Sequence, residues 1–122
     1  MLAPGPAKKV TIYLNEDTIS EGGYLSETIV SLLLEARVAG ATVIRPASGF
    51  GSHHHLHTPA GGIDADLHMP VRIEFIESEA NLTGILPRLE SLVVDGLIEA
   101  HDTTILKSIE AYSIASEADG VS

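Results

Sequence analysis

Histidines concentrate in one short stretch of the chain, and their spacing suits a metal ion. The stretch reads Ser52-His53-His54-His55-Leu56-His57. In an extended segment His53, His55 and His57 would point to one side, whereas in a helix His53 and His57 would lie one turn apart. Imidazole is a good ligand for Zn²⁺, Ni²⁺ or Cu²⁺. The site would be completed by residues that follow closely in the sequence: Asp64, Asp66 and His68.

The same histidines allow two other interpretations. Unperturbed imidazoles titrate near ~6.5, so the stretch can act as a pH sensor. Protonation of all six histidines would change the formal charge of the chain from −10 to −4. Alternatively, a glycine-flanked histidine loop is simply hydrated and holds no ligand. The sequence alone leaves the three interpretations open.

A second candidate site precedes the histidines. Gly49-Phe50-Gly51 is followed by Ser52, and Arg45 is the nearest cation. Glycines let the backbone approach a ligand closely, and their N–H groups can hold an anion. Glycines are also common where a strand passes into a loop, and Arg45 can equally form a surface pair with a glutamate. These residues are therefore candidates for ligand binding.

Composition excludes several classes of function. The chain has 122 residues, with 7 Lys+Arg against 17 Asp+Glu, which gives a net charge of −10. This charge argues against nucleic acid or an anionic membrane surface as a partner. The chain has no cysteine. No apolar run approaches the ~18 residues of a membrane span, so we expect a cytoplasmic protein without membrane insertion.

The motifs of common enzyme classes are also missing. The sequence has no G-x-S-x-G, no H-E-x-x-H and no P-loop. Acidic residues near positions 16–21 are typical of a hydrated surface. Those near 74–79 precede or begin an expected helix, where negative charges are favourable. No second group is placed beside a histidine by its spacing. We therefore expect a protein that is not an enzyme.

The hydrophobic pattern predicts four strands and two helices. Alternation of apolar and polar residues indicates strands, and apolar residues at helical spacing indicate helices. Ser78 is an expected helix cap, Gly40 an expected helix end, and Pro87 predicts a kink or a late start of the second helix. In chain order we expect a strand at 8–15, a helix at 24–39, strands at 41–47 and 71–75, a helix after 78 and a strand at 97–106.

This order predicts an α+β fold, the ferredoxin-like βαββαβ arrangement, with a long loop at 48–67 between the second and third strands. Both helices would cover one face of the sheet. We expect the other face to be apolar and to drive oligomerisation. Residues 1–7 are expected to form a flexible arm, residues 8–107 the domain, and residues 108–122 an acidic tail.

Several motifs resemble one family in their order and spacing. They are Glu21-Gly22-Gly23, the string ATVIRPASGFG at 41–51, Leu56-His57 and Gly96-Leu97-Ile98. Together they resemble the PII-like signalling proteins, and within them most closely the family called domain of unknown function 190. The resemblance covers about residues 8 to 107.

The resemblance implies a homotrimer with small-molecule effectors in the clefts between subunits, an adenine nucleotide being a candidate. It also implies that loop 48–67 contacts a target protein or a transporter. The turn before the last strand, with Asp95 and Gly96, would belong to the ligand site. In contrast to PII proteins that bind ATP or ADP, this turn has no Lys or Arg. The sequence thus favours a PII-like regulator, and the alternative is a trimer that binds divalent transition metals through its histidines.

Overall fold

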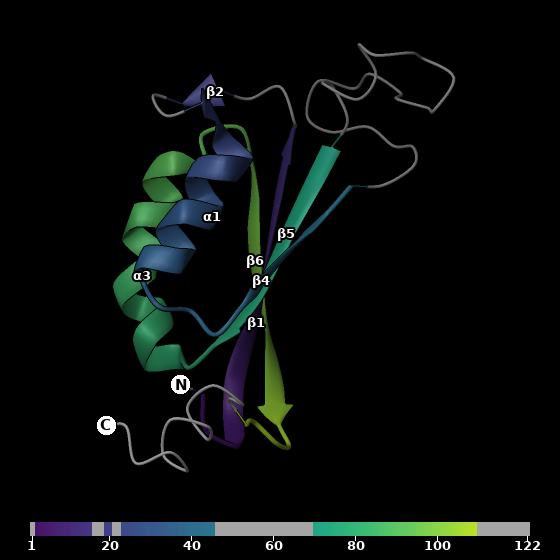
Figure 1. Cartoon of the computed structure of the whole chain (residues 1–122), viewed down its shortest axis with the longest axis vertical. Coiled ribbons are helices and arrows are strands. Elements are labelled where there is room, and N and C mark those ends of the chain that lie inside the picture. The colour runs from purple at the N-terminus through teal and green to yellow at the C-terminus, as the bar shows by residue number, and fades with distance from the viewer. Residues whose placement is uncertain (1, 16–18, 21–22, 46–69, 110–122) are drawn as a thin grey trace, which may run out of the picture.

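The computed structural model of the chain describes residues 2–15, 19–20, 23–45 and 70–109. A four-stranded sheet is covered on one face by two helices (Figure 1). The elements in chain order are β1 (Gly5–Asn15), β2 (Ile19–Ser20), β3 (Gly23–Tyr24), α1 (Leu25–Glu35), β4 (Ala41–Ile44), β5 (Pro70–Glu77), α3 (Glu79–Leu92) and β6 (Gly96–Ile105).

The main sheet has the strand order β4-β5-β1-β6, and every neighbouring pair is antiparallel. Strand β1 therefore lies inside the sheet, and β4 and β6 form its two edges. In the register, Val10 faces Phe75 on β5 and Ala100 on β6. This is the order of a ferredoxin-like βαββαβ domain, so the predicted fold is confirmed.

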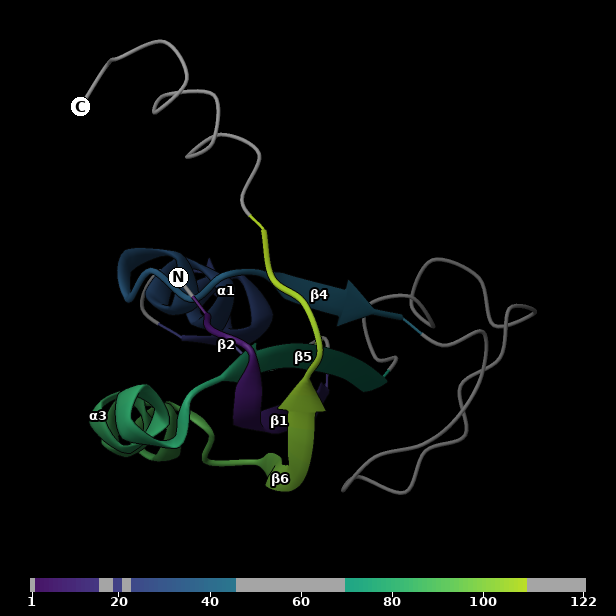
Figure 2. The ribbon, with the colours of Figure 1, turned by 90° about the horizontal axis from the view of Figure 1, so that it is seen from below.

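The core lies between the sheet and the two helices (Figure 2). Strands β1 and β5 contribute every second residue to it, and each helix contributes one stripe, as the two periodicities require. All but one of its buried side chains are aliphatic. The members below 4% exposure are Val10, Ile12, Leu14, Leu25, Ile29, Leu33, Val71, Ile73, Phe75 and Leu89.

Helix α1 ends four residues earlier than predicted, and Gly40 does not end it. Arg37 adopts the left-handed conformation with φ 61° directly after the last turn. The N–H of Val38 then donates to the carbonyl of Leu33, and the N–H of Arg37 donates to that of Leu34. This is the bond pattern of a Schellman motif, which satisfies two carbonyls at the helix end. A non-glycine residue occupies the left-handed position, which the sequence rules did not anticipate.

Helix α3 begins at the predicted cap. The Ser78 hydroxyl accepts a hydrogen bond from the Asn81 N–H at 3.2 Å, and the buried Glu77 carboxylate accepts bonds from the Ser78 N–H and the Asn81 side chain. The predicted late start is wrong, because the helix runs from Glu79 through Pro87 to Leu92. Pro87 lies on the exposed side, where water can satisfy the carbonyl that loses its N–H donor.

Strand β1 begins at Gly5, so the predicted arm overlaps the sheet. Residues 5–7 pair with residues 103–105 of β6, and Ala7 is only 5% exposed. The segment between β1 and α1, in which the hydrophobic pattern gave no element, contains the short paired strands β2 and β3. In both places backbone hydrogen bonding to another strand forms the structure. The prolines and glycines in these segments gave no strand signal in the sequence.

The face of the sheet opposite the helices differs from the prediction. We expected it to be apolar, but most side chains on it are polar or charged. Apolar residues on it are interspersed, and Leu97 is 55% exposed. The reason is that most apolar alternates of β1 and β5 point under the helices, which leaves mainly polar alternates outside. The polar members from β5, β1 and β6 are Arg72, Glu74, Lys9, Thr11, Tyr13, Glu99 and His101.

Two glycines allow a matched test of this packing. A Cβ at Gly96 would lie 2.2 Å from the backbone carbonyl oxygen of Tyr13, whereas a Cβ at Gly84 in α3 would meet nothing within 4 Å. We expect Gly96→Ala to lower the free energy of unfolding by about 1–3 kcal/mol, because the central strand must move. Gly84→Ala should raise it by about 0.5–1 kcal/mol through helix propensity. Urea denaturation at one protein concentration measures the free energy of unfolding of both variants. Equal changes in the two variants would contradict the close approach of Gly96 to the Tyr13 carbonyl.

Candidate functional site

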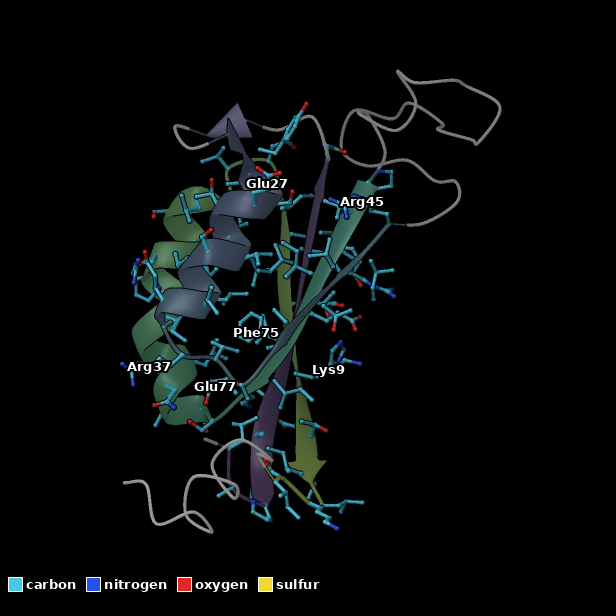
Figure 3. All side chains as sticks on the ribbon, in the orientation of Figure 1. Lys9, Glu27, Arg37, Arg45, Phe75 and Glu77 are labelled. Atoms are coloured by element: carbon cyan, nitrogen blue, oxygen red, sulfur yellow. The ribbon has the colours of Figure 1, made fainter. Side chains whose placement is uncertain are left out.

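One end of the sheet gathers the described residues that the sequence predicted for ligand binding. Here β1 and β4 end and β5 and β6 begin, so that Asn15 faces Pro70 and Leu14 faces Gly96. Residues 46–69 connect β4 to β5 at this same end. We call it the loop end of the sheet. Figure 3 shows Arg45 at this end and Glu27 near it, in the first turn of α1.

The predicted ligand residues at the loop end lie on opposite edges of the sheet. Arg45 follows edge strand β4, whereas Asp95 and Gly96 mark the start of edge strand β6. Three strand spacings separate the two edges, which is about 14 Å at ~4.8 Å per spacing. Within one chain, therefore, Arg45 and the Asp95–Gly96 turn are not neighbours.

The turn before β6 is held against the central strand. The Asn15 side-chain amide donates to the Asp95 carboxylate at 3.5 Å, and Asn15 itself is 5% exposed. Gly96 lies so close to the Tyr13 carbonyl that only glycine fits. Gly96 thus has a steric reason to be glycine whether or not it contacts a ligand. Val94 in the same turn is 81% exposed, so the turn presents a surface beside the sheet edge.

The remaining predicted site residues lie outside the described part of the chain. These are the ligand candidates Gly49, Phe50, Gly51 and Ser52 and the metal candidates His53, His55, His57 and His68. Within residues 2–15, 19–20, 23–45 and 70–109, no group of three or more His, Cys, Asp or Glu side chains is placed to hold a metal ion. No helix in the same ranges has the length and apolar character to span a membrane.

A polar cluster on the open face was not predicted as a site. The hydroxyl of Tyr13 donates to Glu99 Oε1 at 2.9 Å, and His101 Nε2 lies 3.5 Å from the same oxygen. On the other side of β1, Glu74 lies 3.1 Å from Arg72 Nε and 3.9 Å from Lys9 Nζ. We call these six residues the open-face cluster. Its signal in the sequence was the polar alternates of three strands, which become neighbours only once the strands pair.

The open-face cluster alternates in charge along the strands. Arg72 lies beyond the two glutamates towards the loop end, and Lys9 and His101 lie on their other side. The hydrogen bond to Glu99 raises the pKa of Tyr13, with burial and the charge of Glu99 acting in the same direction and Arg72 opposing them. The cluster is therefore a structured network of charges on a half-buried surface.

A separate ion pair ties β1 to β6 at the other end of the sheet. Lys8 and Asp102 face each other in the register, and their side chains form a close hydrogen-bonded pair. That bond raises the pKa of Lys8 and lowers the pKa of Asp102. Since Asp102 is 88% exposed, the pair is screened by water and contributes little to stability. We assign it no binding role.

Comparison with known proteins shows the family of this chain. Residues 7–105 match DUF190, described as Uncharacterized ACR, COG1993. The chain belongs to this DUF190 family. The UPF0166 protein MJ1524 of Methanocaldococcus jannaschii is 31% identical over 107 residues, which cover 87% of this chain and 96% of that protein. The resemblance stated from the sequence is therefore confirmed.

Solved structures place the DUF190 chain in the PII-like fold. CPII, a nitrogen regulatory PII-like protein from Thiomonas intermedia K12, superimposes with a TM-score of 0.58 at 24% identity, over 88% of this chain and 94% of CPII. That CPII structure contains ADP, AMP and bicarbonate. A PII-like signaling protein from Thermus thermophilus gives a TM-score of 0.61 at 18% identity, over 86% of this chain and 94% of that one. At these identities the likeness establishes the fold.

The Tyr13–Glu99 hydrogen bond can be tested by titration. In a Tyr24→Phe, Tyr112→Phe background Tyr13 is the only tyrosine, and its ionisation is followed by ultraviolet absorbance. We expect Glu99→Gln to lower the pKa of Tyr13 towards its ordinary value of 10.0, because the carboxylate acceptor and its charge are removed together. Asp102→Asn, which removes a distant carboxylate, should leave the pKa unchanged.

The sign of the linked stability follows from the direction of the shift. Because folding raises the pKa of Tyr13, the hydrogen bond stabilises the fold at pH values below the ordinary 10.0 and is lost as the pH rises through the folded-state pKa. The stability difference between the background protein and its Glu99→Gln variant should therefore shrink above pH 10. A difference that persists unchanged there would contradict the assigned bond.

Proposed function

We propose that this DUF190 protein is a PII-like regulator: a homotrimer that binds a small effector, with an adenine nucleotide as the candidate, in clefts between subunits. One observation carries the proposal. Arg45 and the Asp95–Gly96 turn lie at the same end of the sheet but on its opposite edges. If edge β4 of one subunit meets edge β6 of the next, one ligand can contact both. Head-to-tail contacts of this kind close into rings.

The residues proposed for the cleft have complementary chemistry for a nucleotide. Arg45 can bind a phosphate through its guanidinium fork, and the backbone N–H groups of Gly49–Gly51 can hold further phosphate oxygens. Asp95 can accept a hydrogen bond from a ribose hydroxyl or an exocyclic amine. The presence of ADP and AMP in the CPII structure supports this class of effector through likeness of fold.

The second part of the proposal concerns partners. In the sequence, residues 48–67 lie between β4 and β5, which end and begin at the loop end, so effector binding there can be coupled to partner binding. We propose a target protein or a transporter as the partner, as the PII-like resemblance implies. We propose binding rather than catalysis, because the sequence contains no G-x-S-x-G, H-E-x-x-H or P-loop motif. No observation favours the metal-binding alternative, and we do not advance it.

Complementation between variants tests the cleft. In the full-length protein, Arg45→Ala should raise the dissociation constant for ADP at least tenfold by removing a charge-assisted contact, and Asp95→Ala should also weaken binding. Rings assembled from an equal mixture of the two variants should recover ADP sites in about a quarter of their clefts, because a cleft needs Arg45 from one subunit and Asp95 from the next. Isothermal titration calorimetry counts those sites.

The outcomes separate the parts of the proposal. Arg88→Ala removes an exposed arginine from α3, which pairs in the native protein with Glu35, and serves as the matched control with unchanged affinity. If the mixture recovers no ADP sites, Arg45 and Asp95 do not contribute to one cleft from two subunits. If the wild-type protein binds neither ADP nor AMP, the adenine nucleotide is not its effector. If light scattering gives the mass of a monomer, a cleft shared between subunits does not exist.

A further inference from the structure

A hollow lies where the outer edge of β5 loses its partner strand. Strand β4 pairs with β5 only as far as Ala41, which faces Phe75, whereas β5 continues to Glu77. The chain that leads into β4 carries Ala39 and Gly40 here, and neither has a bulky side chain to fill the space. The hollow has a volume of about 410 Å³, which is enough for a small ligand.

Apolar side chains form one wall of the hollow. Leu2 and Ile76 line it, and each is half-buried. Leu2 precedes β1, and Gly5 at the start of that strand has φ 125°, a backbone conformation that favours glycine. The beginning of the chain therefore lies against the edge of β5 and gives the hollow an aliphatic surface.

Polar groups from three strands form the other wall. Lys9 of β1, Thr42 of β4 and Glu74 of β5 all line the hollow. Thr42 faces Glu74 in the register, and Figure 3 shows Lys9 pointing away from the helices, on the open face. An ammonium, a hydroxyl and a carboxylate are thus grouped beside an apolar wall.

The charges of Lys9 and Glu74 are close, but each can take a further partner. Lys9 Nζ lies 3.9 Å from Glu74 Oε2, which is longer than the about 2.7–3.2 Å of a hydrogen bond. Glu74 Oε1 lies 3.1 Å from Arg72 Nε, so Arg72 is the nearer cation of this carboxylate. The Lys9 side chain is 47% exposed. Its ammonium can therefore bind an anionic group of a ligand while it stays beside Glu74.

We propose that the hollow binds an aliphatic α-amino acid in its zwitterionic form. The α-carboxylate contacts the Lys9 ammonium and the Thr42 hydroxyl, and the α-ammonium contacts Glu74. The aliphatic side chain packs against Leu2 and Ile76. Because both charges of an α-amino acid are attached to one carbon, they can align antiparallel to the Lys9–Glu74 pair, so that each charge meets an opposite one. The inference goes beyond the proposed nucleotide site and does not depend on it.

Charge favours a zwitterion over a simple acid or amine. The chain has a net charge of −10, which repels anions from its surface. A zwitterion has no net charge and is not repelled. A carboxylic acid without an amine would place a second carboxylate beside Glu74, and an amine without a carboxylate would place a second cation beside Lys9. A ligand with both charges avoids both conflicts.

Isothermal titration calorimetry with the full-length protein tests the class of ligand. L-leucine should bind at one site per chain. Two analogues divide its charges, since isocaproate keeps the carboxylate and isopentylamine keeps the ammonium. Each analogue should bind at least tenfold more weakly than leucine, because one charge-assisted contact is lost. Affinities equal to that of leucine, or no saturable binding of leucine, isoleucine and valine at millimolar concentrations, would overturn the proposal.

Two neighbouring lysines give a matched pair of variants. Lys9→Gln removes the cation that holds the α-carboxylate, and it should raise the dissociation constant for leucine at least tenfold. Lys8→Gln removes a lysine that pairs with Asp102 and does not line the hollow, so it should leave this constant unchanged. Equal effects of the two variants would overturn the contact assigned to Lys9.

Glu74→Gln tests the second contact with a readout that general damage to the fold would not give. The variant should raise the dissociation constant for leucine at least tenfold. It should not weaken the binding of isocaproate, which has no ammonium. Equal weakening of both ligands would overturn the contact between the α-ammonium and Glu74.

Filling the hollow is an independent test. A Cβ at Gly40 would meet nothing within 4 Å, and the same holds at Gly84 in α3. Gly40→Leu places a side chain in the hollow and should abolish leucine binding, whereas Gly84→Leu, outside the hollow, should retain it. Circular dichroism checks that both variants are folded. Wild-type affinity for leucine in Gly40→Leu would overturn the assigned place of the site.

These outcomes are distinguishable from failure of the proposed function. Arg45 and Asp95 do not line the hollow, so Lys9→Gln should leave the affinity for ADP unchanged. Binding of leucine by a protein that binds no ADP would support this site and show that the adenine nucleotide is not the effector. Binding of ADP without binding of any of the three amino acids would overturn this site alone.

Discussion

The two-sided pairing of β1 is the constraint on which the described structure depends. Residues 8–14 of this strand pair with β5 on one side and with β6 on the other. Their alternation therefore sets the faces of the whole sheet: Val10, Ile12 and Leu14 point under the helices, and the residues between them point to the open face. Gly96 must be glycine because β6 approaches the Tyr13 carbonyl so closely. A shift of one residue in this register would exchange core and surface.

The same pairing decides what the surfaces can do. Side chains from three strands meet on the open face, where Glu99 and Glu74 lie between basic neighbours from adjacent strands. This face is a network of charges rather than the apolar surface that the strands predict when each is considered alone. Association driven by apolar burial would therefore use exposed apolar side chains that lie outside this network of charges, and Leu34, Val94 and Leu106 are examples in the described part of the chain.

The sheet order places the proposed ligand residues at its edges, and this would link ligand binding to assembly. Strands β4 and β6 end the sheet on opposite sides. Arg45 follows one edge strand, and Asp95 precedes the other. In a head-to-tail ring the two edges would meet at the loop end, so an effector bound there would act on the contact between subunits.

By itself, the sequence determined the βαββαβ order, the apolar strand and helix faces and the Ser78 cap, because each follows from local periodicity or local hydrogen bonding. The family was indicated by the resemblance of several motifs. It did not determine the end of α1 at Arg37, the strand pairing of residues 5–7, or the cluster around Tyr13 and Glu99. The pairing of residues 5–7 and the cluster depend on partners far away in the chain, whose backbone groups and charges become neighbours only when the strands pair. The end of α1 is local, but it places a non-glycine residue, Arg37, in the left-handed conformation, which its side chain does not signal. The separation of Arg45 from Asp95 was likewise decided by tertiary structure, since only the strand order places them on opposite edges.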